Sequence, residues 1–180
     1  MELRISTRQV LKLLYILSWI IFIGVCVEAG SFIFNAVFSL AVNSYAARYF
    51  NLSDLFEYNR GYFVVELMLM SIAGIMRALM FYLIVKVLGD KKLNISQPFT
   101  KEAVRFIFKI AFLALGIGMF SYWGSEYTAW LVNLGVKMPD LRYLRLGRAD
   151  VWLFMGIVLL VIAQLFKRGI EIQSENELTI

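Results

Sequence analysis

The chain has 180 residues, of which 61% are hydrophobic and 17% charged, with a formal net charge of +5. This composition leaves too little polar surface for a water-soluble domain, and it indicates one membrane domain. The single cysteine, Cys26, excludes an intramolecular disulfide, and the absence of histidine removes the commonest general base and metal ligand. We therefore expect no metal and no cofactor, and the sequence designates no catalytic residue.

Four apolar stretches predict an all-α bundle of four transmembrane helices, because about 20 apolar residues suffice to cross a bilayer as a helix. The predicted spans are residues 13–33, 62–88, 106–123 and 149–166. The segments between and after them are expected on two sides of the membrane: 43–61 and 124–148 outside, and the loop 89–103 and the tail 167–180 inside.

Two of these helices leave alternatives open. Apolar character in the first continues to Val42, which is too long for one perpendicular crossing, so the helix tilts, bends near Gly30 or leaves the bilayer. The third helix either stops near Gly124 or continues to about Leu134.

Helix-capping residues are also recognisable. Ser6 and Gln9 have the spacing of a capping box at the start of the first helix. Thr100 is a favourable N-cap for the third span, and Ser53 for a short helix in the first outer segment.

The distribution of basic residues predicts the topology. Eleven of the 18 Lys and Arg residues fall in the termini and the loop 89–103 with its flanks, six fall in the two outer segments, and Arg77 lies within the second span. The positive-inside rule then puts both termini in the cytoplasm. This bias accounts for the net charge without any binding of nucleic acid.

Charged residues inside the spans form the main candidate site, consisting of Glu28, Glu66 and Arg77. An arginine within a span costs about 2.5–3.5 kcal/mol on insertion scales, so Arg77 needs a partner. Glu66 lies on the same helix face as Arg77, but the sequence does not decide whether Glu66 or Glu28 is the partner of Arg77. Such a cluster either binds a ligand, ion or proton or ties helices together. Further polar candidates are Asn35, Glu126 and Gln164.

Two patterns concern helix surfaces. Lys101, Arg105 and Lys109 are spaced four apart and would meet anionic lipid headgroups, although ordinary positive-inside flanking explains them equally. The spacings Gly74-x-x-x-Ala78 and Ala114-x-x-x-Gly118 permit close helix approach, either inside the bundle or between copies in a homo-oligomer.

The end of the chain resembles a known family. After the last span, a basic stop is followed by Gly169, Gln173, Glu175, Asn176, Leu178 and Thr179. Together with QPFTKEAVRFIFKIA before the third span, this resembles the YoaS-like family of small four-span bacterial membrane proteins of unknown function. Family tails often have Asp where Glu177 stands. The resemblance implies residence in the bacterial cytoplasmic membrane and supplies no catalytic residues.

Members of this family are often encoded beside a small helix-turn-helix regulator. The resemblance therefore implies a cytoplasmic protein partner, and we expect the tail to bind it through Gly169, Gln173, Glu175, Leu178 and Thr179.

Three functions remain open at this stage. The first is a non-enzymatic sensor or regulatory partner whose helix packing around Arg77 responds to a signal. The second is a small transporter or channel subunit with a path through Glu28, Glu66 and Arg77. The third is a lipid-handling enzyme, which requires a groove open to the bilayer beside paired carboxylates. What contacts the Arg77 guanidinium discriminates between scaffolding and ligand binding.

Overall fold

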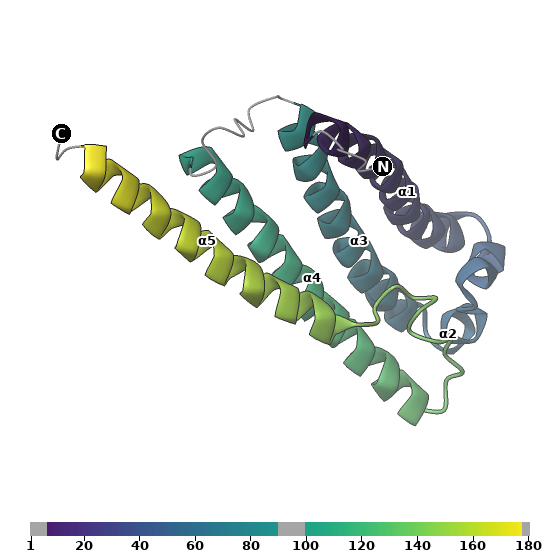
Figure 1. Ribbon diagram of the computed structural model, residues 1–180. Helices are drawn as coiled ribbons and strands as arrows, with labels where there is room; N and C mark the ends of the chain where they lie inside the picture. Colours follow the sequence, from purple (N-terminus) through teal and green to yellow (C-terminus); the bar gives the residue numbers. More distant parts are fainter. Residues whose placement is uncertain (1–6, 90–99, 178–180) are drawn as a thin grey trace, which may run out of the picture.

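The computed structural model describes residues 7–89 and 100–177, and these residues form helices and connecting segments (Figure 1). Four helices are long and apolar enough to cross a membrane, which confirms the predicted all-α class with four membrane-length helices. The elements are α1 (Thr7–Ala41), the 3-10 helix η1 (Ser44–Phe50), α2 (Ser53–Tyr58), α3 (Arg60–Gly89), α4 (Lys101–Asn133) and α5 (Ala149–Glu177).

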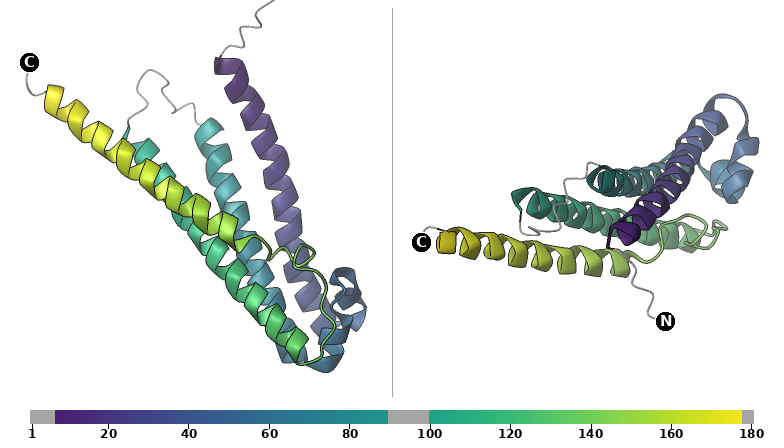
Figure 2. Two further views of the ribbon diagram at one scale, coloured as in Figure 1. Left: turned by 60° about the horizontal axis from the view of Figure 1, so that its bottom comes forward. Right: turned by 45° about the horizontal axis from the view of Figure 1, so that its top comes forward.

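The four long helices form an open bundle. Within the described residues α1 packs on α3, α3 on α4 and α4 on α5, and α1 makes no helix contact with α5. Figure 2 shows the helices converging where η1, α2 and the α4–α5 connection (134–148) lie, which we call the loop end. They diverge towards the opposite end, which holds the start of α1 and the end of α5 and which we call the terminal end.

The structure shows the lengths of α1 and α4, which the sequence left open. α1 is an unbroken helix of 35 residues through Gly30. At 1.5 Å per residue it measures about 52 Å, well above a hydrocarbon core of about 30 Å, so it tilts or extends beyond the bilayer. α4 continues through Gly124 to Asn133.

The predicted N-cap of α4 is confirmed, since the Thr100 side chain accepts a hydrogen bond of 3.1 Å from the backbone N–H of Ala103. The predicted capping role of Ser53 is wrong: Leu52 precedes α2, no side chain caps the helix, and Ser53 is already its first helical residue. Ser6 lies outside the described residues.

Asn59 begins α3. Its side-chain Oδ1 accepts hydrogen bonds from the backbone N–H groups of Gly61 at 2.8 Å and Tyr62 at 3.2 Å. These are two of the four N–H groups that a helix start leaves without an intrahelical partner.

The contact between α4 and α5 depends on glycine. A Cβ atom at Gly118 would lie 2.7 Å from Cγ of Leu153, and one at Gly156 would lie 2.6 Å from Cγ of Leu115. The spacing from Ala114 to Gly118 therefore serves close approach inside the bundle, as the first alternative predicted.

The larger apolar core lies at the loop end and contains Phe32, Phe63 and Leu131 together with Leu144 and Leu146 of the α4–α5 connection. Leu146 packs against α4 at Gly124, where a Cβ would lie 2.6 Å from its Cδ1. The connection, expected as an outer segment, therefore folds back along the helices. A smaller core contains Met80, Ile110 and Ile117.

Candidate functional site

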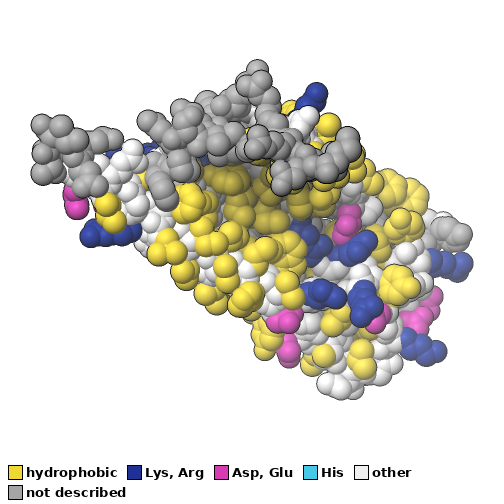
Figure 3. Space-filling model, viewed as in Figure 1, with side chains coloured by type: hydrophobic (Ala, Val, Ile, Leu, Met, Phe, Trp, Pro, Cys, Tyr) yellow, Lys and Arg dark blue, Asp and Glu magenta, His cyan; other side chains and the backbone are white. Residues whose placement is uncertain are grey.

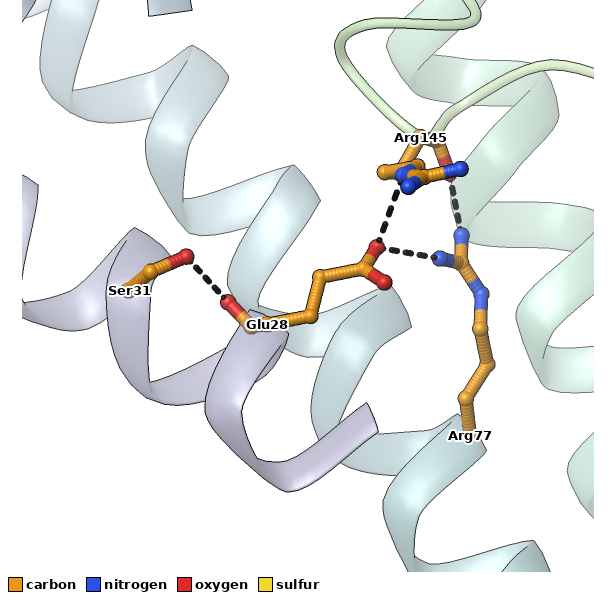
Figure 4. A network of polar contacts seen from close by, with 4 residues as sticks. All are labelled: Glu28, Ser31, Arg77 and Arg145. Atoms are coloured by element: carbon orange, nitrogen blue, oxygen red, sulfur yellow. Dashed lines mark hydrogen bonds and ion pairs between the residues drawn. The ribbon is translucent and has the colours of Figure 1, made fainter. Parts of the chain in front are cut away.

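Three charged side chains from three separate segments meet in one network (Figure 4). Glu28 of α1 places its Oε1 atom 3.6 Å from Nη1 of Arg77 on α3 and 3.2 Å from Nε of Arg145 in the α4–α5 connection. Nη2 of Arg77 also donates a hydrogen bond to the backbone carbonyl of Arg145. The partner of Arg77, which the sequence left open between Glu28 and Glu66, is therefore Glu28. The network joins α1, α3 and the connection.

This network lies deep along α3. Arg77 is 17 residues after Arg60, or about 26 Å from the loop end of the helix. Arg145 reaches it from a segment without regular helix, and non-helical backbone at membrane depth persists only where protein buries it or it lines a water-filled cavity. Arg145 also has a φ of 58°, a left-handed conformation that is uncommon for a non-glycine residue.

An open pocket lies beside the network. It has a volume of about 630 Å³ and is lined by residues of α1, η1, Asn51 and the α4–α5 connection. Its polar lining includes Glu28, Ser31, Asn51, Arg142 and Arg145. Figure 3 shows basic and acidic side chains gathered on this face of the molecule, next to extensive apolar surface.

Positive charge exceeds negative charge around the pocket. Among its lining residues Glu28 is the one acid, against Arg142 and Arg145, and Arg77 adds a third guanidinium behind the carboxylate. Nε of Arg77 is buried and has no hydrogen-bond partner within the described residues, and neither does Oε1 of Glu28. The contacts of 3.2 and 3.6 Å are therefore ion pairs without hydrogen-bond geometry, and the guanidinium groups outnumber the one carboxylate.

Glu66 belongs to a different site, although the sequence grouped it with Glu28 and Arg77. Its side chain is fully buried, and its Oε1 accepts a hydrogen bond of 3.0 Å from the Thr128 hydroxyl of α4. Thr128 also hydrogen-bonds to the Gly124 carbonyl at 2.9 Å. The three predicted residues are thus divided between an α1–α3–connection network and an α3–α4 contact.

The remaining polar candidates lie apart from the pocket. Asn35 is buried on α1 and accepts a 3.4 Å hydrogen bond from Ser39. Glu126 and Gln164 are exposed on α4 and α5.

The predicted lipid and partner residues belong to the terminal end. Lys101, Arg105 and Lys109 are exposed along the first turns of α4. Of the predicted partner-binding tail, Gly169, Gln173 and Glu175 continue α5 as helix, whereas Leu178 and Thr179 lie outside the described residues.

Sequence reasoning missed Arg142, Arg145 and Thr128 as site residues. The alternation of leucine and arginine in Leu141–Arg148 was a usable signal for the arginines, since Leu144 and Leu146 prove fully buried and hold the segment against the helices. Within residues 7–89 and 100–177, no group of three or more His, Cys, Asp or Glu side chains is placed to hold a metal ion.

Four membrane-length helices with an arginine-rich pocket at membrane depth define a multi-pass membrane protein. The chain belongs to the DUF2975 family of proteins of unknown function, whose model matches residues 56–180. The match begins after α1 and within α2, and it includes α3, α4 and α5 with Arg77 and Arg145. The narrower YoaS-like naming stays a prediction. No curated protein and no solved structure shows significant similarity to the chain.

Proposed function

We propose that the protein is a non-enzymatic sensor in the bacterial cytoplasmic membrane, with both termini in the cytoplasm. In this mechanism an occupant of the pocket alters the contacts of Glu28 and Arg145, and α1 shifts relative to α3. The terminal end then reports the change to a cytoplasmic protein. The family resemblance suggests a helix-turn-helix regulator as that partner.

The observation that carries this proposal is the Glu28–Arg77–Arg145 network at the edge of an open pocket. One carboxylate holds two guanidinium groups from two other segments, through ion pairs of 3.2 and 3.6 Å without a full hydrogen bond to its Oε1. An occupant that competes for either arginine changes the packing of three segments at once. A ligand shifts a conformational equilibrium only by such differential contacts.

The open bundle supports α1 as the moving element. Among the long helices α1 packs on α3 alone. Very few side chains of its most apolar stretch are buried by the rest of the protein. α1 contributes Phe32 to the large core at the loop end, but its turns before Ala29 carry few buried side chains. Those earlier turns can therefore move with little core rearrangement.

The transporter alternative requires a path through Glu28, Glu66 and Arg77. Glu66 hydrogen-bonds to Thr128 at the contact between α3 and α4 and is not part of the Glu28–Arg77 network, so the geometry gives such a path less support. Proton or solute flux in proteoliposomes that disappears in Glu28→Gln would favour transport over sensing.

The topology is tested by cysteine labelling in a Cys26→Ser background, which removes the one native thiol. In intact cells, a membrane-impermeant maleimide should label Lys137→Cys and should label Lys86→Cys only after permeabilisation. Both native lysines are exposed, so access to the side chain is not limited by packing. The reverse pattern would contradict cytoplasmic termini.

The partner is tested by co-purification with a helix-turn-helix regulator of the kind that the family resemblance implies beside the gene. Deletion of Gln173–Ile180 should abolish the complex, whereas Gln164→Ala, an exposed change on the same helix, should retain it. Unchanged co-purification of the deletion variant would show that the tail is not the binding site for the partner.

A further inference from the structure

We propose that the pocket binds an anionic amphiphile, with its phosphate or carboxylate group at Arg142 and Arg145 and its apolar part along α1 at Gly24 and Val27. This inference names the ligand class of the sensing pocket and in that respect rests on the proposed function. The charge of the pocket, its apolar wall and its tyrosine residues point to this ligand class.

The charge of the pocket selects an anion. Arg142 and Arg145 line it, Arg77 lies behind Glu28, and Glu28 is the one acidic group among the lining residues. Guanidinium groups bind phosphate and carboxylate in bidentate geometry, and they are less strongly hydrated than ammonium groups. One carboxylate cannot neutralise three guanidinium groups, so an anionic headgroup would neutralise part of the remaining positive charge.

The wall on the side of α1 selects an apolar portion. Gly24, Val27, Phe32 and Phe50 line the pocket together with the polar residues. Val27 is 69% exposed, and a Cβ atom built at Gly24 would meet nothing within 4 Å. The pocket therefore continues into open space along a helix face of membrane character. A small hydrated anion needs no such wall.

The pocket extends from the charged network towards η1. Glu28 and Arg77 lie deep along their helices, whereas Tyr49 and Phe50, which line the pocket together with Glu28, belong to η1. Tyr49 and Tyr143 are of the residue type enriched at the boundary between hydrocarbon and headgroups. An amphiphile with its charged group at Arg142 and Arg145 and its apolar part along α1 would therefore meet both polar and apolar surroundings.

The experiment measures lipid binding to the purified full chain by native mass spectrometry. The probes are phosphatidylglycerol and phosphatidylcholine with identical acyl chains, and inorganic phosphate as a competitor. We expect selective binding of phosphatidylglycerol, and Arg142→Gln should weaken it about tenfold, as for the loss of one charge-assisted contact, without affecting phosphatidylcholine. Inorganic phosphate should compete weakly, which separates a lipid source from a free anion.

Two glycines of α1 provide matched variants. Gly24→Leu should fill the pocket and reduce phosphatidylglycerol binding about tenfold, since loss of apolar contact for a few methylene groups has this size. Gly30→Leu makes the same change in helix propensity and also meets open space, but Gly30 does not line the pocket. It should bind as the unaltered protein does.

Three results would overturn the inference. They are equal binding of the two lipids, equal binding by Gly24→Leu and Gly30→Leu, or displacement of the lipid by inorganic phosphate at equal concentration. Arg142→Gln keeps the test decisive if changes at Arg145 prevent folding, because Arg145 belongs to the Glu28 network. The assay contains no regulator, so its failure leaves the co-purification result for the sensor proposal intact.

Discussion

The loop end and the terminal end of the molecule differ in how tightly they are packed. At the loop end, η1, α2, the α4–α5 connection and the helices bury a large common core that includes Phe32, Phe63 and Leu146 with no exposure. Towards the terminal end the helices diverge, and α1 and α5 do not pack together (Figure 2). Local stability is greatest where buried apolar contacts are densest, so we expect the loop end to be the more rigid of the two ends.

This difference assigns roles to the two ends. The charged network and the pocket lie where α1 meets the loop-end segments, and the tail of α5 lies at the other end. In the proposed mechanism, a rearrangement at the network would be transmitted along continuous helices to an end with fewer contacts to resist it.

The largest effect is expected from Gly124→Leu. Its side chain would collide with Leu146 and detach the α4–α5 connection from α4, at a cost of about 3 kcal/mol in the free energy of unfolding. Gly89→Leu at the terminal end has the Tyr15 ring as its nearest neighbour among the described residues, at 3.3 Å from the added Cβ, and should cost under about 1 kcal/mol. Unfolding in mixed micelles measures both. Equal losses would contradict a packing difference between the ends.

The charged network should give the next largest effect. Arg77→Gln leaves Glu28 without one of its two guanidinium partners, and we expect a loss of about 2 kcal/mol, below the cost of breaking a fully buried pair because both side chains retain some exposure. Glu28→Gln should behave similarly. In a double-mutant cycle the two changes should be strongly non-additive. Additive losses would mean that the 3.6 Å ion pair does not couple the helices.

The Glu66 contact should give a smaller effect. Thr128→Val removes the hydroxyl that Glu66 accepts a hydrogen bond from and should cost about 1–2 kcal/mol, because the carboxyl group is fully buried. Thr128→Ser keeps the hydroxyl and should retain most of the stability in the same unfolding assay. Equal losses for valine and serine would assign the effect to packing and not to the hydrogen bond.

The smallest effects are expected from the helix caps, at about 1 kcal/mol each. Asn59→Ala acts at the loop end and should lower the global stability, because α3 starts beside the large core there. Thr100→Ala acts at the terminal end and should mainly raise amide hydrogen exchange in the first turn of α4. Exchange that spreads through α4 and α5 after Thr100→Ala would indicate that both ends unfold as one unit.

The parts that sequence reasoning predicted depend on local physics. Long apolar runs have no stable alternative to membrane-length helices, because every backbone polar group must be satisfied within the helix. The cap at Thr100 follows from local stereochemistry, and the need of Arg77 for a partner follows from its cost in lipid. The structure agrees with all three.

The capping role predicted for Ser53 is wrong, and Glu66, which the sequence grouped with Glu28 and Arg77, makes its contact elsewhere. Ser53 has the right side chain for a cap, but the helix of α2 begins one residue earlier than that role requires. Glu66 shares a face with Arg77, yet three helical turns separate them, and Thr128 of the neighbouring helix is closer. Periodicity gives the face of a residue and not its partner on another helix.

The class of the protein, its four membrane-length helices and the need of Arg77 for a counter-charge therefore follow from the amino-acid sequence alone. The tertiary contacts were needed to show that Glu28 meets this need together with Arg145, and that the α4–α5 connection folds back to form a pocket there. The physical reason is that helix formation in lipid is satisfied within each segment, whereas the network depends on glycine contacts and buried leucines that bring three distant segments together.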